Sequence, residues 1–305
     1  MFVQGVHDFL WDARQVQEKR GHATSEPEDF LRLGSGMPGW AMLVGLIDEG
    51  QEIHVGEEAG LTQWNDALGS VDVPWVVPAP AKVAHVFTNA GPVRTSDHLD
   101  LTVSLRSHLA EDLQTWVTDL LSGDLDAARA LLPRVREQGF EVYVTRDLDA
   151  ATSYVRARYE GMQDKRYGLL ASSKASNLKS VGLDTWTQGV KHHKAGPWFN
   201  NPPSDPASCC RLLDIATEFV CQGLELDFPI LCWGTDFTWG GEGWNVRPSR
   251  TMAGRRAPED PAALRLNSYR VLLSRGRDGM ALFVPEQPAL DETYRMLRSV
   301  GVPTL

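Results

Sequence analysis

The chain has 305 residues, of which 42% are hydrophobic and 23% are charged, and its formal net charge is −10. This composition is that of a globular protein, and the length predicts about two domains. The acidic balance argues against a chain that binds nucleic acid through its overall charge, because such proteins usually carry a basic domain or stripe. No apolar run reaches the roughly 18 residues that a membrane span needs. We therefore expect no contact with a membrane.

The N-terminus and the cysteines indicate a cytoplasmic protein. The first eight residues lack the basic and apolar regions of a secretory signal. The four cysteines, Cys209, Cys210, Cys221 and Cys232, contain no CxxC pair. This spacing predicts neither a disulfide framework nor a zinc site, and we expect buried thiols in a reducing compartment. No metal site is predicted from the sequence.

The first half of the chain mixes helices with short strands. Ser25 followed by Glu28 is a capping box, which predicts a helix over 27–33. The apolar run from Ala41 to Ile47, ending in Asp48, is typical of a parallel strand covered on both faces. Patterns of the same kind predict helices over 11–19, 60–68, 107–122 and 125–138, and strands over 75–77 and 84–88.

From residue 141 onward, strands alternate with helices. We predict strands over 141–145, 167–171, 230–233 and 281–284, and helices over 149–159, 210–215, 263–275 and 290–300. This alternation predicts an α/β protein with parallel sheets, right-handed crossovers and helices on both faces. We place the domain boundary near Gly139, with an N-terminal domain over 1–138 and a C-terminal domain over 139–305.

Two segments of the C-terminal half carry candidate chemistry. In Asn267–Gly279, an apolar stretch leads into Ser-Arg-Gly-Arg, and a guanidinium can bind two phosphate oxygens at once. The second segment, Glu218–Asp227, precedes the apolar run Phe228–Trp233. In order and spacing, the two segments resemble the last two motifs of superfamily 1 helicases. More narrowly, the chain resembles the bacterial Schlafen-like DNA/RNA helicase domain family, also through Lys19–Pro27, Gly50–Ile53, Tyr167–Ser173, Trp198–Asn200 and Ser208–Cys210.

The resemblance implies a RecA-like P-loop NTPase fold that uses ATP and Mg²⁺ and acts on DNA or RNA, with one partial N-terminal domain and one complete C-terminal domain. By this resemblance Arg275 reaches the γ-phosphate, a cation supplied across a cleft to the transferring group. The remaining residues that it implies are Arg270 and Arg277 as further phosphate contacts, Gln222, Gly223 and Glu225 in the motif that couples nucleotide to strand, Asp48 and Gln51 in a D-x-x-Q motif, and Arg106 at the domain junction.

A phosphate-binding P-loop is not found in this sequence. A P-loop needs a Gly-Lys pair, and the 305 residues contain none. Gly5 and Val6 stand where the family places an acidic pair before Trp11-Asp12. A competing interpretation takes Asp48-Glu49, directly after the apolar run 41–47, as this acidic pair. We prefer to assign Asp48 and Gln51 to the D-x-x-Q motif.

Three explanations stay open at this stage. The chain is a remnant of a longer helicase, a degenerate homologue, or one subunit whose partner supplies the P-loop. We expect a helicase-like protein that is catalytically incomplete as an isolated chain. The alternative is a non-enzymatic module that binds nucleic acid or protein as a scaffold in a defence or repair assembly.

Local features offer further contacts for a nucleic-acid strand. Basic residues gather in Lys191–Lys194 and in Arg247–Arg256. Four tryptophans could stack on bases or serve as core anchors, namely Trp198, Trp233, Trp239 and Trp244.

Overall fold

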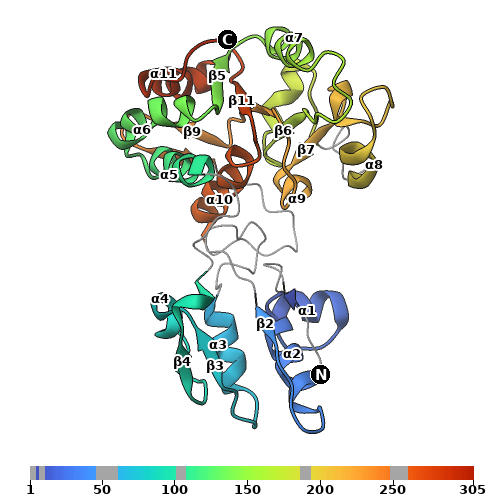
Figure 1. Cartoon of the computed structure of the whole chain (residues 1–305), viewed down its shortest axis with the longest axis vertical. Helices are drawn as coiled ribbons and strands as arrows, with labels where there is room; N and C mark the ends of the chain where they lie inside the picture. The colour runs from blue at the N-terminus through green and yellow to red at the C-terminus, as the bar shows by residue number, and fades with distance from the viewer. Residues whose placement is uncertain (1–4, 7–10, 46–60, 101–107, 186–193, 248–259) are drawn as a thin grey trace. The chain divides into compact units, whose positions relative to one another are not determined.

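The structure is a computed structural model that describes residues 5–6, 11–45, 61–100, 108–185, 194–247 and 260–305. The chain divides into two compact units, Met1–Ser104 with Arg255–Asp260 and Leu105–Gly254 with Pro261–Leu305 (Figure 1). The division predicted near Gly139 lies within the second unit. There α5 (His108–Ser122) packs on α10 (Pro261–Leu273), and α6 (Leu125–Glu137) packs on β5 (Glu141–Thr145).

The N-terminal unit contains short strands in two parallel pairs. Strand β1 (Gly5–Val6) pairs with β2 (Val44–Gly45), and β3 (Val77–Ala79) pairs with β4 (Val93–Thr95). The other elements are α1 (Ala13–Arg20), α2 (Glu26–Ser35), α3 (Leu61–Gly69), α4 (Ala81–Ala84) and a 3-10 helix over Asp97–Leu99. Its core gathers around Leu31, Trp64, Ala67 and Leu68, on the facing sides of α2 and α3.

The helix predicted over 27–33 is confirmed as part of α2, together with its N-terminal cap. Ser25 caps α2 by accepting a hydrogen bond from the backbone N–H of Glu28 at 3.3 Å, as the capping box predicts. The predicted strand over 41–47 is described only as far as residue 45, and Val44 there is exposed rather than covered on both faces. The strand predicted over 84–88 is wrong: the short helix α4, with Pro80 as its N-cap, ends at Ala84, and the next strand starts only at Val93.

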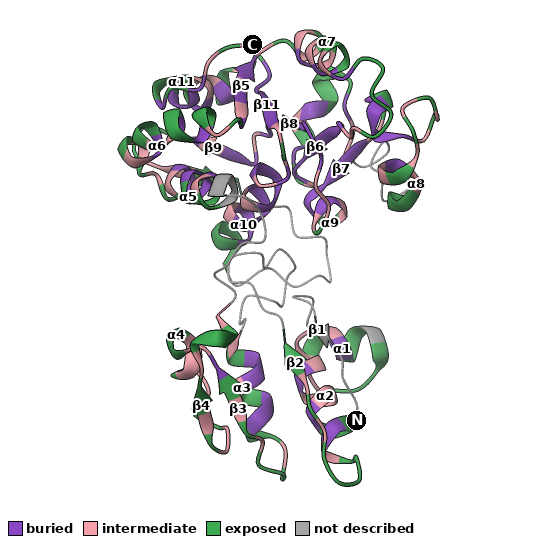
Figure 2. Cartoon of the chain, in the orientation of Figure 1, coloured by how far each residue is buried: buried purple, intermediate pink, exposed green. Residues whose placement is uncertain are grey.

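The C-terminal unit is built on a five-stranded parallel sheet, which confirms the predicted α/β class and is compatible with a RecA-like fold (Figure 1). The strands lie in the order β5, β11 (Gly279–Phe283), β8 (Ile230–Cys232), β6 (Leu169–Ala171) and β7 (Ile215–Thr217). All four pairings are parallel. The strands are almost wholly buried, as expected for a parallel sheet covered by helices (Figure 2).

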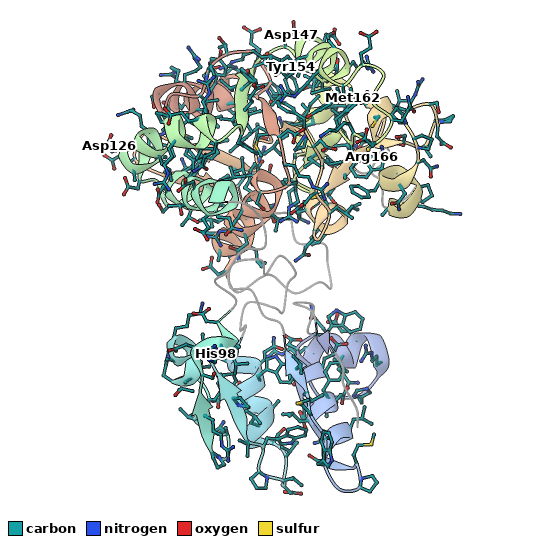
Figure 3. The ribbon with its side chains drawn as sticks, viewed as in Figure 1. His98, Asp126, Asp147, Tyr154, Met162 and Arg166 are labelled. Carbon is teal, nitrogen blue, oxygen red and sulfur yellow. The ribbon has the colours of Figure 1, made fainter. Side chains whose placement is uncertain are left out.

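Several helices of this unit contact the sheet. Contacts with the sheet are made by α6, by α7 (Leu148–Arg158), by α9 (Glu218–Cys221) and by α11 (Asp291–Ser299). Asp147, labelled in Figure 3, caps α7 by accepting hydrogen bonds from the amides of Asp149 and Ala150. The remaining elements are α8 (Ala195–Asn200), the hairpin strands β9 (Phe237–Trp239) and β10 (Trp244–Val246), and 3-10 helices over Ser176–Val181, Cys209–Arg211 and Pro288–Leu290.

One predicted helix of this unit is wrong. The stretch 210–215 begins as a 3-10 turn, and Leu212 then adopts a left-handed conformation with φ 57°. Ile215 and the two residues after it form β7, the edge strand next to β6. The apolar residues of this stretch fit helical spacing, but the left-handed residue ends any helix there.

Candidate nucleotide-facing site

The two helicase-like segments lie side by side, because each leads into one of two neighbouring strands. Glu218–Asp227 precedes β8 and Asn267–Gly279 leads into β11, and these strands pair in parallel. The amide of Leu226 donates to the carbonyl of Arg275 at 2.8 Å, and the amide of Arg277 donates back to Leu226 at 2.9 Å. Residues about fifty positions apart therefore form one ladder at the amino edge of the sheet.

Arg275 lies at the centre of this junction and is buried, with 5% of its surface exposed. Its Nε donates to the carbonyl of Val271 at 2.9 Å, at the C-terminal end of α10. Its Nη1 donates to the carbonyl of Leu224 at 3.3 Å, and its Nη2 to Ser274 Oγ at 2.9 Å. A cation at a helix C-terminus is stabilised by the helix dipole. The longest of these three bonds is the one to Leu224.

Two further arginines of the segment are more accessible. Arg277 Nε pairs with Glu225 Oε2 at 3.0 Å, and the arginine side chain is 57% exposed. Such an exposed pair contributes little stability and leaves guanidinium N–H groups facing solvent. Arg270 is half-buried in α10 and donates to Asn267 Oδ1 at 2.8 Å. The junction thus joins one buried arginine, one half-buried arginine and one exposed arginine.

Gln222 and Gly223 form the turn between α9 and β8. The amide of Gln222 donates to the carbonyl of Glu218 at 3.1 Å, which ends α9. Gly223 follows with φ 79° and is exposed, with open space where a side chain would stand. This is a left-handed position, which glycine adopts without strain. The turn presents the loop Gln222–Glu225 at the surface beside Arg277.

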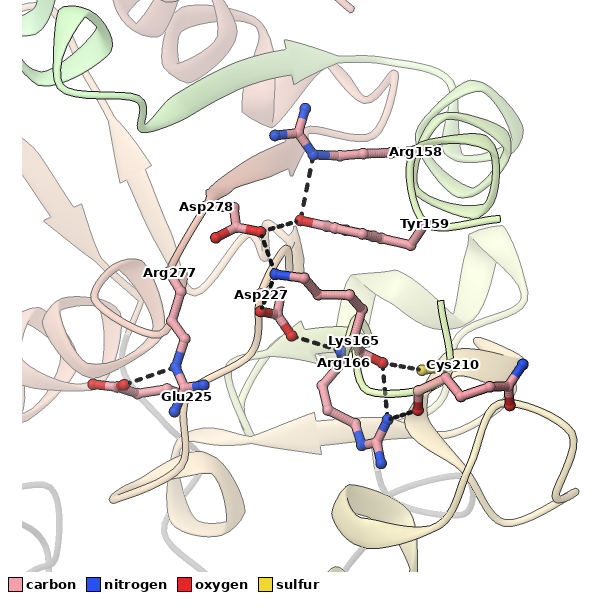
Figure 4. Close-up of polar contacts among 10 residues, drawn as sticks. Arg158, Tyr159, Lys165, Arg166, Cys210, Glu225, Asp227, Arg277 and Asp278 are labelled. Atoms are coloured by element: carbon pink, nitrogen blue, oxygen red, sulfur yellow. Dashed lines mark hydrogen bonds and ion pairs between the residues drawn. The ribbon is translucent and has the colours of Figure 1, made fainter. Parts of the chain in front are cut away.

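A polar network that the sequence did not indicate joins the residues just before β8 and β11. Lys165 Nζ contacts Asp227 Oδ1 at 3.0 Å and Asp278 Oδ2 at 3.1 Å, and the hydroxyl of Tyr159 donates to Asp278 at 2.8 Å (Figure 4). Hydrogen bonds to the two carboxylates raise the pKa of Lys165, and burial raises the pKa of Tyr159. Each aspartate lies at or next to the end of one of the two segments, shortly before β8 or β11. That shared position was the only signal in the sequence, since Lys165 itself lies far from both along the chain.

Comparison with known families decides the relationship. The family model described as Schlafen group 3, DNA/RNA helicase domain, matches residues 10–286. The chain belongs to this Schlafen helicase-domain family. No curated protein matches the chain.

Three site residues predicted by resemblance to Schlafen helicases are not placed by the structure. Asp48, Gln51 and Arg106 lie outside the described residues, as do Lys191 and most of the basic stretch 247–256. Among the residues that the structure describes, no group of three or more His, Cys, Asp or Glu could hold a metal ion. Within the same part of the chain, no helix is long and apolar enough to cross a membrane.

The four tryptophans considered for base stacking mostly serve as anchors in this Schlafen helicase domain. Trp198, Trp233 and Trp239 are buried. Trp244 is half-buried, stacks on Phe237 with ring centroids 4.2 Å apart, and donates from Nε1 to the carbonyl of Leu120 at 3.0 Å. These contacts favour packing as their role.

Proposed function

We propose that this chain supplies the arginine-bearing half of a nucleic-acid motor and is catalytically incomplete on its own. The observation that carries the proposal is the junction of Glu218–Asp227 with Asn267–Gly279, which brings Arg275, Arg277 and Glu225 together beside an exposed turn. Arginines gathered in this way suit a phosphate, because each guanidinium offers several N–H donors in one plane. Membership of a DNA/RNA helicase domain family supports the same class of function.

ATP would supply the phosphoryl group whose transfer drives such a motor. In this chain Arg275 would turn its Nη1 from the carbonyl of Leu224 toward a phosphate, while Nε keeps its bond to Val271. Glu225 would then orient Arg277 beside it. The arginines at the junction suit the phosphate, and the described residues contain no group of three or more side chains that could hold a metal ion. Asp48 and Gln51 stay candidates for sensing the γ-phosphate through the D-x-x-Q motif, and Arg106 stays a candidate for a phosphate contact.

The proposal predicts no ATP turnover by the isolated chain. Phosphate release is measured with and without single-stranded DNA or RNA, for the wild type and for Arg275→Ala, with Arg298→Ala as a control on α11. We expect background release in all cases, because the 305 residues lack the Gly-Lys pair of a P-loop. Robust release that Arg275→Ala abolishes and Arg298→Ala preserves would overturn the incompleteness. In that case the chain would hydrolyse ATP without a second polypeptide that supplies a P-loop.

Nucleic-acid binding separates the motor half from a pure protein scaffold. Fluorescence anisotropy with labelled single strands is expected to show binding that weakens as salt rises, since phosphate contacts release counterions. Arg277→Ala should weaken it, because this side chain is exposed at the junction. The scaffold alternative has its own support in the acidic net charge and in the carbonyl contacts of Arg275. Absence of binding to both DNA and RNA would favour it. We place either activity in the cytoplasm, where the four free cysteines stay reduced.

A further inference from the structure

A second polar cluster lies at the opposite, carboxyl edge of the sheet and is almost completely buried. Ser172 follows β6 and donates to Asp236 Oδ2 at 2.7 Å, in the loop after β8. Arg265, from the first half of α10, donates to Ser172 Oγ at 2.7 Å and pairs with Asp236 at 3.1 Å. Strands β6 and β8 are neighbours whose chain connections run in opposite directions along the sheet. The cluster therefore occupies the switch point of this sheet.

The same cluster reaches the first residue of the helicase-like segment 218–227. Glu218 is 1% exposed and accepts hydrogen bonds from the amide of Ser173 at 2.8 Å and from its hydroxyl at 2.9 Å. Arg265 Nη1 lies 3.9 Å from Glu218 Oε1. Buried charges are costly unless they are paired and hydrogen-bonded, and apolar residues of similar volume often stabilise a fold equally well. The geometry of this cluster thus points to fixing a position rather than to packing alone.

Helix α10 therefore contacts the segment 218–227 at both ends. Its first half reaches Glu218 through Arg265, and Arg275, just beyond its C-terminal end, reaches the carbonyl of Leu224. The helix has 13 residues, which corresponds to about 20 Å. Between the two contacts lies Gly223, which forms a turn in the left-handed conformation. The two arginines form a clamp, which we name after Arg265 and Arg275.

We propose that Arg265 is a positioning residue that, through this Arg265–Arg275 clamp, sets the place of the loop Gln222–Glu225. When a phosphate draws Arg275 away from Leu224, Arg265 keeps Glu218 and the start of α9 on the sheet. The loop then bends at Gly223 instead of detaching from β8. The use of the clamp in a motor rests on the proposed function, whereas the clamp itself rests only on the contacts described.

Hydrogen exchange measured by mass spectrometry on the full chain tests the clamp. The amides of Leu224 and Leu226 donate to Cys221 and Arg275, so their exchange reports the far end of the segment. Arg265→Lys keeps the charge but loses the planar fork, and we expect about tenfold faster exchange over 222–227. Arg146→Lys is the control, because Arg146 also pairs with an aspartate, Asp291, and makes a second bond, to the carbonyl of Pro285. It should leave exchange over 222–227 unchanged.

Exchange that rises only around Ser173, with 222–227 unchanged in the folded Arg265→Lys chain, would overturn the proposal. If that variant does not fold, Glu218→Gln replaces it, since it removes the charge facing Arg265, keeps one acceptor oxygen for Ser173 and replaces the other with an NH2 group. For this variant too, faster exchange over 222–227 is expected, and a rise confined to the region around Ser173 would overturn the proposal. Anisotropy with a single strand is recorded on the same samples. If the wild type binds no nucleic acid, the proposed function is refuted. The exchange result still tests the Arg265–Arg275 clamp independently.

Discussion

Replacement of Lys165 by methionine should destabilise the C-terminal unit, because this lysine joins two carboxylates that precede neighbouring strands. Its side chain is 28% exposed, and those of Asp227 and Asp278 are 10% and 34% exposed. A hydrogen bond to a charged group contributes about 1.5–3 kcal/mol, and partial exposure places the sum of the two near the lower end, about 3 kcal/mol. For a unit of about 200 residues this lowers the unfolding temperature by roughly 6–12 °C.

Differential scanning calorimetry measures this change, with Lys179→Met as the matched control. Lys179 pairs with Asp184 at 3.1 Å, but its side chain is 60% exposed. Such a pair contributes about 0–1 kcal/mol, so the control should shift the unfolding temperature by less than about 4 °C. Equal shifts for the two variants would refute the view that Lys165 holds the strand ends in place.

The pH dependence of the Lys165 effect has a definite sign. The two carboxylates raise the pKa of Lys165 above its ordinary value of 10.5. The stability that the lysine adds is therefore fully present below its unfolded pKa and is lost as the pH rises through the higher folded pKa. The difference between wild type and Lys165→Met should stay constant from neutral pH up to mildly alkaline pH and shrink only in strong alkali. A difference that shrinks on approach to neutral pH would contradict this assignment.

Two other substitutions test the turn and the buried carboxyl. Gly223→Ala places a side chain at φ 79° and should cost about 1–2 kcal/mol, whereas Gly196→Ala, at an ordinary φ with open space, should be close to neutral in the same denaturant titration. Burial raises the pKa of Glu218 above its usual range, so the folded state holds a proton more firmly than the unfolded state. Wild type should therefore lose stability relative to Glu218→Gln as the pH rises above about 4.5. If the unfolding midpoints of the two proteins change equally with pH, the burial effect on Glu218 is refuted.

The sequence is enough to predict the α/β class and the strands that carry the helicase-like segments. Strands β5, β8 and β11 have short apolar runs, and α10 and α11 have helical spacing, so local pattern and tertiary environment agree there. Prediction failed where a single backbone conformation outweighed the pattern. Leu212 ends a stretch of helical spacing, and the short helix α4, capped by Pro80, ends at Ala84, where a strand was expected to begin.

The composition, the two motifs and the missing Gly-Lys pair are properties of the sequence alone, and so is the candidate status of Arg275. Only the tertiary structure decides what that arginine contacts. The pairing of β8 with β11 brings residues about fifty positions apart into one ladder, and it turns Arg275 toward the carbonyls of Val271 and Leu224. Lys165 and Arg265 become visible in the same way. Their partners are set by which strands are neighbours in the sheet, and strand order is a long-range property that no local pattern contains.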